Sequence, residues 1–349
     1  MIYAVGLFVF ISIALPLAFA WRLWRLDLPT RLAWLIVAAE TAALVWLILL
    51  LGRWDIAGMW TRAALACLVL VAAVVSGVRH LQRPWRVRDE ASFWHGHGPM
   101  LASTADNPTV LVYFSGDVLL KTKQGVRFVG SGYERRSPKL IERDVARWSE
   151  RAGVPAIFIA RPGMFGSSGD HNQRREPREV MLMERTLDAI KRRHRVSTFI
   201  LVGQSGGGHI AASLLNRRRD VSAVVLSSAL LSVREVTDYW NKRRTVQSDG
   251  AVLYDPIDHL AGIRSDSRPM ILVLSDPQDR IVPYQSQLTY VRRLQAAGFE
   301  PQQILLSATD KNHHALARHG RRAAELVARG EPIGAIRAAL EDVGMQPTE

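Results

Sequence analysis

A serine flanked by glycines at a predicted strand-to-helix turn is the strongest chemical signal in the sequence. The segment Gly203-Gln204-Ser205-Gly206-Gly207 follows the apolar run 199–202 and precedes the helical pattern 209–215. A sharp turn there raises the serine hydroxyl above the end of the strand, and the flanking glycines avoid clashes. The N-terminus of the helix also stabilises developing negative charge. The pattern predicts a nucleophile at Ser205; the alternative is a tight glycine-rich turn without chemistry.

A nucleophilic serine needs a base to take its proton and an acid to orient that base. Two candidate acids, Asp276 and Asp279, and two candidate bases, His313 and His314, follow Ser205 in the chain order of a strand-end triad. The base takes the hydroxyl proton and later returns it to the leaving group. We choose His313 as the base and keep His314 as the alternative, because adjacent side chains point in different directions and the sequence does not decide between them.

Six short apolar runs alternate with helical patterns from residue 109 onward and predict the sheet that positions these residues. The runs are 109–114, 155–160, 198–203, 221–227, 270–275 and 303–307. They are expected to be buried on both faces, in a mostly parallel sheet with helices on each side. The serine, the acids and the histidines all follow the C-terminal ends of such runs, where ligand sites of open α/β sheets lie.

Two segments resemble the α/β-hydrolase superfamily. Asp279-Arg280-Ile281-Val282-Pro283 resembles its Asp-x-x-Val-Pro acid loop, and this resemblance selects Asp279 over Asp276. The segment from Arg161 to Gly169 is similar to a loop of serine hydrolases in the prolyl-oligopeptidase and dienelactone-hydrolase branches. The resemblance covers about residues 105 to 330 and implies an α/β-hydrolase fold with a Ser205–His–Asp279 triad.

The resemblance also implies an oxyanion hole, the pair of N–H groups that binds the tetrahedral intermediate. One donor is the backbone N–H of Gly206, the residue after the nucleophile. Phe114-Ser115-Gly116-Asp117 stands where the family has His-Gly-x, which makes the Asp117 N–H the second donor. Ser115 departs from that pattern, and the Asp117 carboxylate would have to point away from the anionic intermediate. No cofactor is expected. Neither is a metal. Asp170, His171 and the pair His95 and His97 are residue types that bind metals, but no further acidic or cysteine residue is spaced to complete a site.

The N-terminal residues contain three apolar runs long enough to cross a membrane. These are 2–20, 32–51 and 56–78, each about 20 residues long. No basic residue precedes the first run and two more runs follow, so we expect it to be retained; the alternative is a signal peptide cleaved after Ala20. Seven arginines flank the spans on one side and two on the other, which places residues after 79 in the cytoplasm. The prediction is a multi-pass protein of a bacterial-type inner or plasma membrane.

The sequence thus divides into three parts: transmembrane helices in 1–80, a basic juxtamembrane linker in 81–104, and an α/β-hydrolase domain in 105–349 with a short lid at about 229–268. The single cysteine, Cys67, excludes a disulfide framework and a CxxC site. The basic clusters 191–195, 217–219 and 242–244 could face anionic headgroups; the alternative, for at least the first two, is solvated helix ends favoured by the helix dipole. Nucleic acid is not expected as a partner, because no aromatic residues interleave with the basic clusters.

The predicted function is a membrane-anchored serine hydrolase that forms an acyl-enzyme on a small-molecule or lipid-like substrate. The scissile bond is an ester, a thioester, or a small amide or peptide bond. Two alternatives stay open: an acyltransferase that uses the same acyl-enzyme, and a noncatalytic membrane scaffold. Nothing in the sequence selects the acyl group or the oligomeric state.

Overall fold

The computed structural model describes residues 95–97, 108–121, 127–130, 133, 136–243, 252–263, 268–341 and 343. All of them belong to one compact unit, Trp85–Glu349. The three predicted membrane spans, and most of the predicted linker, lie outside the described residues. Within the described ranges, no helix combines the length and apolar character needed to span a membrane.

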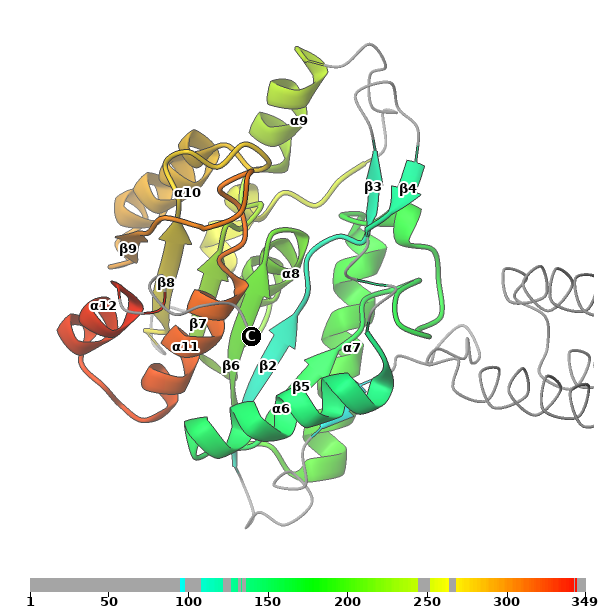
Figure 1. Cartoon of the computed structure of the whole chain (residues 1–349), viewed down its shortest axis with the longest axis vertical. Coiled ribbons are helices and arrows are strands. Elements are labelled where there is room, and N and C mark those ends of the chain that lie inside the picture. Colours follow the sequence, from blue (N-terminus) through cyan, green and yellow to red (C-terminus); the bar gives the residue numbers. More distant parts are fainter. Residues whose placement is uncertain are drawn as a thin grey trace, which may run out of the picture. The chain divides into compact units, whose positions relative to one another are not determined.

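A mostly parallel sheet forms the centre of the unit (Figure 1). In the described part of the chain the strand order is β1-β5-β2-β6-β7-β8-β9. All neighbours run parallel except β1, which pairs antiparallel with β5 at the edge. The strands are β1 (His95–His97), β2 (Thr109–Phe114), β5 (Ala156–Ile159), β6 (Thr198–Gln204), β7 (Val221–Ser227), β8 (Met270–Ser275) and β9 (Gln302–Leu305). The mostly parallel α/β sheet predicted from the sequence is therefore confirmed.

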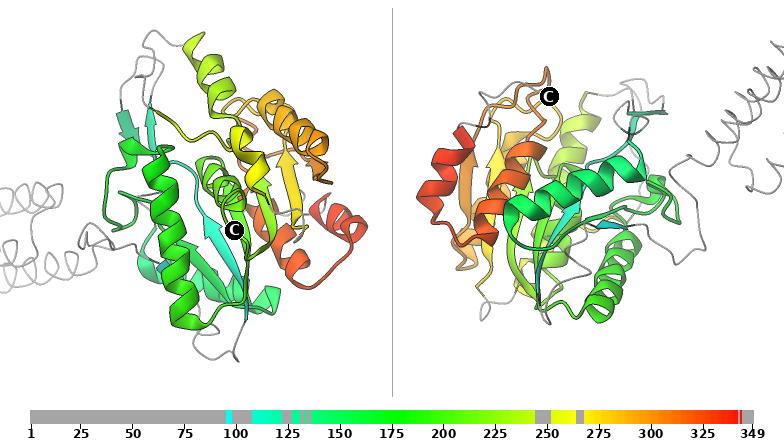
Figure 2. Two further views of the ribbon diagram at one scale, coloured as in Figure 1. Left: turned by 180° about the vertical axis from the view of Figure 1, so that it is seen from behind. Right: turned by 60° about the horizontal axis from the view of Figure 1, so that its bottom comes forward.

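Helices cover both faces of the sheet (Figure 2). On one face lie α7 (Pro177–His194), α8 (Gly206–Leu215) and α10 (Tyr284–Ala296), and on the other lie α6 (Pro138–Ala152), α11 (Ala317–Ala328) and α12 (Ile333–Glu341). The core splits in the same way, because successive strand residues point to opposite faces. Along β2, Val110 and Val112 pack on the first face, whereas Leu111 packs on the second.

Local sequence signals set the ends of α6. Ser137 is the N-cap, and its hydroxyl accepts a hydrogen bond from the Leu140 N–H at 3.3 Å. Pro138 occupies the first helical position, where its missing N–H has no helical partner to lose. The helix stops at Gly153, whose φ of 73° suits a residue without a side chain.

Smaller elements lie beyond the C-terminal ends of the parallel strands, around the predicted site (Figure 1). They include the hairpin of β3 (Leu119–Lys121) and β4 (Arg127–Val129) and the helix α9 (Val233–Asn241). Two 3₁₀ turns, η1 (His171–Gln173) and η2 (Pro256–Gly262), complete the described elements. The predicted lid at 229–268 contains α9 and η2.

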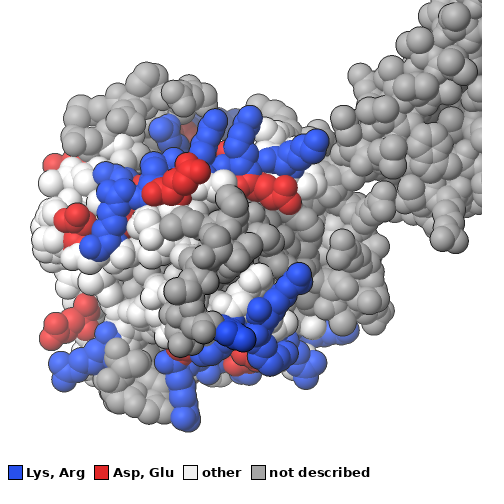
Figure 3. Space-filling view, turned by 90° about the horizontal axis from the view of Figure 1, so that it is seen from below, with Lys and Arg blue, Asp and Glu red and all other residues white. Residues whose placement is uncertain are grey.

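Two of the basic clusters, 191–195 and 217–219, lie at the opposite edge, where β6 and β7 begin. Figure 3 shows this face from below, with acidic side chains among the lysines and arginines along its border. Lys191 is ion-paired with Asp220, and Arg217 with Glu184. Part of the positive charge that the sequence suggested for headgroup binding is therefore matched within the protein itself.

A buried neutral histidine makes the stability of this fold depend on pH. His209 lies in α8, and its Nε2 donates a hydrogen bond to the Tyr254 carbonyl at 2.8 Å. Burial lowers the pKa of His209 to about 3. As the pH falls below the ordinary histidine pKa of ~6.5, His209 becomes protonated in the unfolded chain but stays neutral in the folded protein. This contribution to stability is therefore lost progressively between about pH 6.5 and pH 3.

We expect the free energy of unfolding to fall by about 1.4 kcal/mol per pH unit through His209 alone between pH 6 and pH 4. Chemical denaturation of the full-length protein at several pH values measures this slope. The matched variant is His209→Gln, whose amide keeps a donor for the Tyr254 carbonyl but does not titrate. Equal slopes for the two proteins would contradict the assignment.

Candidate active site

Ser205 stands in a strained turn between β6 and α8. Its backbone has φ 55° and ψ −121°, a conformation that costs a non-glycine residue roughly 1–3 kcal/mol. Neighbouring backbone holds the turn in place: the Ser205 N–H donates to the Ser227 carbonyl at 3.0 Å, and the Leu230 N–H donates to the Ser205 carbonyl at 3.1 Å. The sheet therefore fixes the conformation expected of a serine nucleophile at this point.

Close backbone approach explains the glycines around Ser205. A Cβ on Gly207 would lie 2.1 Å from the Phe114 carbonyl oxygen, and one on Gly203 would lie 2.3 Å from the Gly207 carbonyl oxygen. Both distances are far shorter than any van der Waals contact. The turn can form in this position only because these residues lack side chains.

Asp279 is held in the loop after β8 by three hydrogen bonds. Its Oδ1 accepts from the N–H groups of Ile281 and Val282 at 2.8 and 2.9 Å. Its Oδ2 lies 2.8 Å from Nδ1 of His314. The carboxylate is thus fixed by backbone donors on one oxygen and orients an imidazole with the other.

His314 lies in the loop between β9 and α11 and is tied to the serine turn. The side-chain amide of Gln204, the residue before Ser205, donates to the His314 carbonyl at 2.7 Å. Asp310 shapes the loop by accepting from the N–H groups of His314 and Ala315 at 2.8 and 2.7 Å. The structure therefore brings His314 together with Asp279 and with the residue adjacent to the nucleophile.

His313, our choice of base from the sequence, has a different partner. Its Nδ1 lies 3.2 Å from Oδ2 of Asp276, the candidate acid that the resemblance did not select. The backbone at His313 has φ 54°, and this bend directs the two adjacent histidines to different carboxylates. The two loops thus contain two Asp–His pairs side by side.

The two residues predicted to supply the oxyanion donors are Gly206, which follows Ser205 in the chain, and Asp117, whose side chain lies against Gly206. A Cβ on Gly116 would be 3.3 Å from Cβ of Ser205, so the loop after β2 runs against the nucleophile. A Cβ on Gly206 would be 2.2 Å from Oδ1 of Asp117. The residues that supply both donors are therefore in contact with each other.

The Asp117 carboxylate is surrounded by arginines to which sequence reasoning gave no role. Its Oδ1 lies 2.8 Å from Nη1 of Arg161, and its Oδ2 lies 3.2 Å from Nε of Arg174 and also pairs with Arg175. Burial by itself raises the pKa of Asp117, but Arg175, Arg161 and Arg174 outweigh burial and hold that pKa well below its usual range. Arg161 was visible in the loop that resembles serine hydrolases, but nothing in the sequence links it to Asp117.

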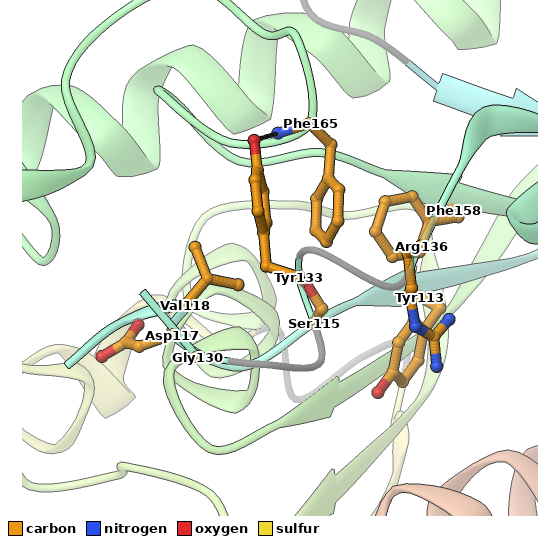
Figure 4. A pocket seen from close by; sticks show the side chains of 9 residues that line it. All are labelled: Tyr113, Ser115, Asp117, Val118, Gly130, Tyr133, Arg136, Phe158 and Phe165. Carbon is orange, nitrogen blue, oxygen red and sulfur yellow. Dashed lines mark hydrogen bonds between the residues drawn. The ribbon is translucent and has the colours of Figure 1, made fainter. Parts of the chain in front are cut away.

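A cavity of about 190 Å³ borders the same loop (Figure 4). Ser115 and Asp117 line it on the side of the loop, and aromatic rings form much of the remaining wall. The Tyr133 and Phe165 rings are 4.7 Å apart, and the Tyr133 hydroxyl accepts a hydrogen bond from the Phe165 N–H at 3.2 Å. The cavity lining consists of Tyr113, Ser115, Asp117, Val118, Gly130, Tyr133, Arg136, Phe158 and Phe165.

Helix α9 of the predicted lid packs on the acid loop. The indole N–H of Trp240 donates to the Ile281 carbonyl at 2.9 Å, and Val233 and Val236 bury their side chains beside Val282. Trp240 is therefore a packing residue that supports the segment holding Asp279. The guanidinium of Arg243 lies over the ring of the neighbouring Tyr239, 3.6 Å from the ring centre.

Metal-ligand geometry is not seen in the described ranges, where no three His, Cys, Asp or Glu side chains converge. His171, one of the histidines considered from the sequence, is buried beside Asp117. Burial is the main reason why its pKa is lowered to about 4, so its ring is neutral at physiological pH.

No protein-family model matches the chain, and no curated protein matches it. Among solved structures, an acylaminoacyl peptidase of Pyrococcus horikoshii is similar over 68% of this chain and 38% of its own length, at 13% identity and a TM-score of 0.45. An esterase of Pyrococcus furiosus is similar over 64% of this chain and 80% of its own, at 10% identity and a TM-score of 0.44.

An acetyl ester-xyloside bifunctional hydrolase of Caldicellulosiruptor lactoaceticus is similar over 75% of this chain and 92% of its own, at 13% identity and a TM-score of 0.44. The chain spans about two fifths of the length of the acylaminoacyl peptidases that it matches. The TM-scores of all these similarities are below 0.5.

Proposed function

We propose that this chain is a serine hydrolase that acts through an acyl-enzyme, with Ser205 as nucleophile, His314 as base and Asp279 as the orienting acid. One observation carries the proposal: the His314–Asp279 pair, 2.8 Å between Nδ1 and Oδ2, is fastened through Gln204 to a strained serine turn at the end of β6. We assign the base to His314 rather than to His313, because His313 pairs with Asp276.

The proposed reaction follows from this pairing. The Asp279 carboxylate accepts a hydrogen bond from the Nδ1–H of His314 and so holds the tautomer in which Nε2 carries no proton and can take the hydroxyl proton of Ser205. The Ser205 oxygen then attacks the acyl carbonyl, and His314 passes the proton to the departing alcohol, thiol or amine. Water, activated by the same imidazole, releases the acid from Ser205. During both steps the N–H groups of Gly206 and Asp117 bind the oxyanion.

The cavity beside the loop after β2 suits a substrate whose acyl group is small and apolar. Its volume of about 190 Å³ exceeds the roughly 150 Å³ of an engineered apolar cavity that holds benzene. Aromatic walls favour an apolar occupant, while Ser115 and Asp117 place the cavity beside the loop that contacts Ser205. The proposed substrate is an ester, thioester or small amide whose acyl part is about the size of a phenyl ring.

Hydrolysis of p-nitrophenyl esters by the full-length protein tests this function. We expect kcat/KM to rise from the acetyl to the phenylacetyl ester and to fall for the dodecanoyl ester, because a long chain exceeds the cavity. A stoichiometric amount of a fluorophosphonate should abolish the activity. No hydrolysis of any of these esters would contradict the function, whereas a rate that keeps rising to the dodecanoyl ester would contradict only the role of the cavity.

We further propose that the runs 2–20, 32–51 and 56–78 anchor the enzyme in a membrane with the hydrolase unit in the cytoplasm. The length of the runs and the excess of flanking arginines on one side support this topology. A cytoplasmic reporter fused after Arg88 should be active, and a reporter that works only in the periplasm should be silent there. The opposite pattern would contradict the topology.

A further inference from the structure

Arg161 is a completely buried arginine held between two carboxylates. Its side chain is 0% exposed, and it lies directly after β5. Nη1 donates to Oδ1 of Asp117 at 2.8 Å, and Nε donates to Oε1 of Glu179 in α7 at 2.9 Å. Burying a cation in this way is costly unless its partners are close and well oriented, and here they are.

This arginine reaches the residues assigned to the oxyanion hole. A Cβ on Gly206 would lie 2.9 Å from Nη1 of Arg161, as well as 2.2 Å from Oδ1 of Asp117. The Arg161–Asp117 ion pair therefore covers the first residue of α8, whose N–H is one proposed donor. The other proposed donor is the N–H of Asp117 itself.

The charged cluster around Asp117 has a net positive charge. Arg161, Arg174 and Arg175 face the carboxylates of Asp117 and Glu179, so positive charge exceeds negative charge by one. His171, which also contacts Asp117, adds no charge because burial lowers its pKa to about 4. An unpaired Asp117 carboxylate would repel an oxyanion formed beside Gly206, whereas this cluster attracts it.

We propose that Arg161 is a positioning residue of the oxyanion hole. By joining Asp117 to Glu179 it fixes the loop after β2 against Gly206, so that the Asp117 N–H stays beside Ser205 and the Asp117 carboxylate is neutralised. The inference rests on the proposed hydrolase function and adds to it a residue outside the triad. It also explains how an aspartate occupies a place where a bare negative charge would oppose the reaction.

A matched control exists in the same protein. Arg218 has a side chain only 6% exposed and pairs with Asp188 and Asp220, each at 2.8 Å. It precedes β7, at the edge of the sheet opposite to Ser205. A lysine at either position keeps the charge but loses the fork that binds two carboxylates at once. Both substitutions should lower stability, and only the one at Arg161 should impair the chemical step.

The experiment compares Arg161→Lys and Arg161→Gln with Arg218→Lys in the full-length protein, using the melting temperature and the kcat and KM for a p-nitrophenyl ester. Loss of one oxyanion donor typically costs about 10²- to 10³-fold in kcat, and we expect Arg161→Lys to cost about 10- to 100-fold with KM within about threefold. Arg218→Lys should keep kcat within about twofold at a similar loss of melting temperature. Adding Asp117→Asn to Arg161→Gln should recover part of the kcat, because the amide carries no charge.

Glu179→Gln keeps the test decisive if the Arg161 variants do not fold. This change leaves Arg161 and Asp117 in place but weakens the anchor on α7, and it should lower kcat about three- to tenfold at unchanged KM. The inference is overturned if the folded variants of Arg161, or Glu179→Gln when those do not fold, keep the wild-type kcat. It is also overturned if kcat falls no more than in Arg218→Lys. A wild-type protein that hydrolyses no ester would instead contradict the proposed function.

Discussion

Replacing Ser205 by alanine is expected to reduce ester turnover by roughly 10⁴- to 10⁶-fold, because the acyl-enzyme cannot form without the serine oxygen. What remains should be the modest rate supplied by binding and by the oxyanion donors. Alanine retains the Cβ and the backbone of the turn, so substrate binding and the fold should change little. Measuring kcat and KM on the preferred p-nitrophenyl ester, together with the circular dichroism spectrum, checks the prediction.

Ser228 provides a matched control for this substitution. It is also a serine with positive φ, 42°, at the end of the next strand, and it is fully buried. Ser228→Ala removes the same atom from a similar backbone conformation and should leave turnover within about threefold of the wild type. A Ser205→Ala protein that keeps more than about a tenth of the wild-type kcat would contradict the role of Ser205.

The second large effect is expected from His314→Ala, which should lower kcat about as much as Ser205→Ala. In a well-characterised serine protease, loss of the nucleophile or of the histidine alone costs about the same, roughly 10⁶-fold, because the residues act as a unit. The reason here is that only His314 pairs with Asp279 and is fastened to Gln204. Steady-state kinetics at a fixed, near-neutral pH provide the measurement.

His313→Ala is the natural comparison, since the two histidines are neighbours in the chain. His313 pairs with Asp276, and its loss should perturb the loop and reduce kcat by less than about tenfold. An inactive His313 variant beside an active His314 variant would assign the base to His313, as the sequence alone suggested. Two inactive variants that fold normally would show that both Asp–His pairs are needed.

Much of the fold was predictable because short apolar runs that alternate with helical patterns are typical of strands buried on both faces of a parallel sheet. The runs 109–114, 221–227 and 270–275 coincide with β2, β7 and β8. By contrast, β1 and the β3–β4 hairpin consist of three-residue strands, too short to show a period of two. In addition, β1 pairs with β5, a strand distant in the sequence, and no local pattern records that pairing.

The site was predictable to the level of loops and not to the level of every side chain. Glycine spacing after β6 marks Ser205, and a five-residue motif marks Asp279. The choice between His313 and His314 depends on a single backbone angle, φ 54° at His313, in a loop shaped by the Asp310 carboxylate. Such a local bend is not visible as a hydrophobic or charge pattern.

The arginine cluster around Asp117 could not be predicted from the sequence, for a different reason. Arg161 and Asp117 are 44 residues apart and meet only because β2 and β5 are adjacent in the sheet. From the sequence, the Asp117 carboxylate is an obstacle to an oxyanion hole. In the folded protein the same carboxylate is one member of a cluster with a net positive charge.

The most direct test of Ser205 as the nucleophile is to locate the adduct of a fluorophosphonate on the full-length protein by peptide mass spectrometry. We expect one adduct per chain, on the peptide that contains Ser205, formed in step with the loss of ester hydrolysis and slowed by substrate. An active protein whose adduct lies on another residue, or whose activity persists without any adduct, would contradict it.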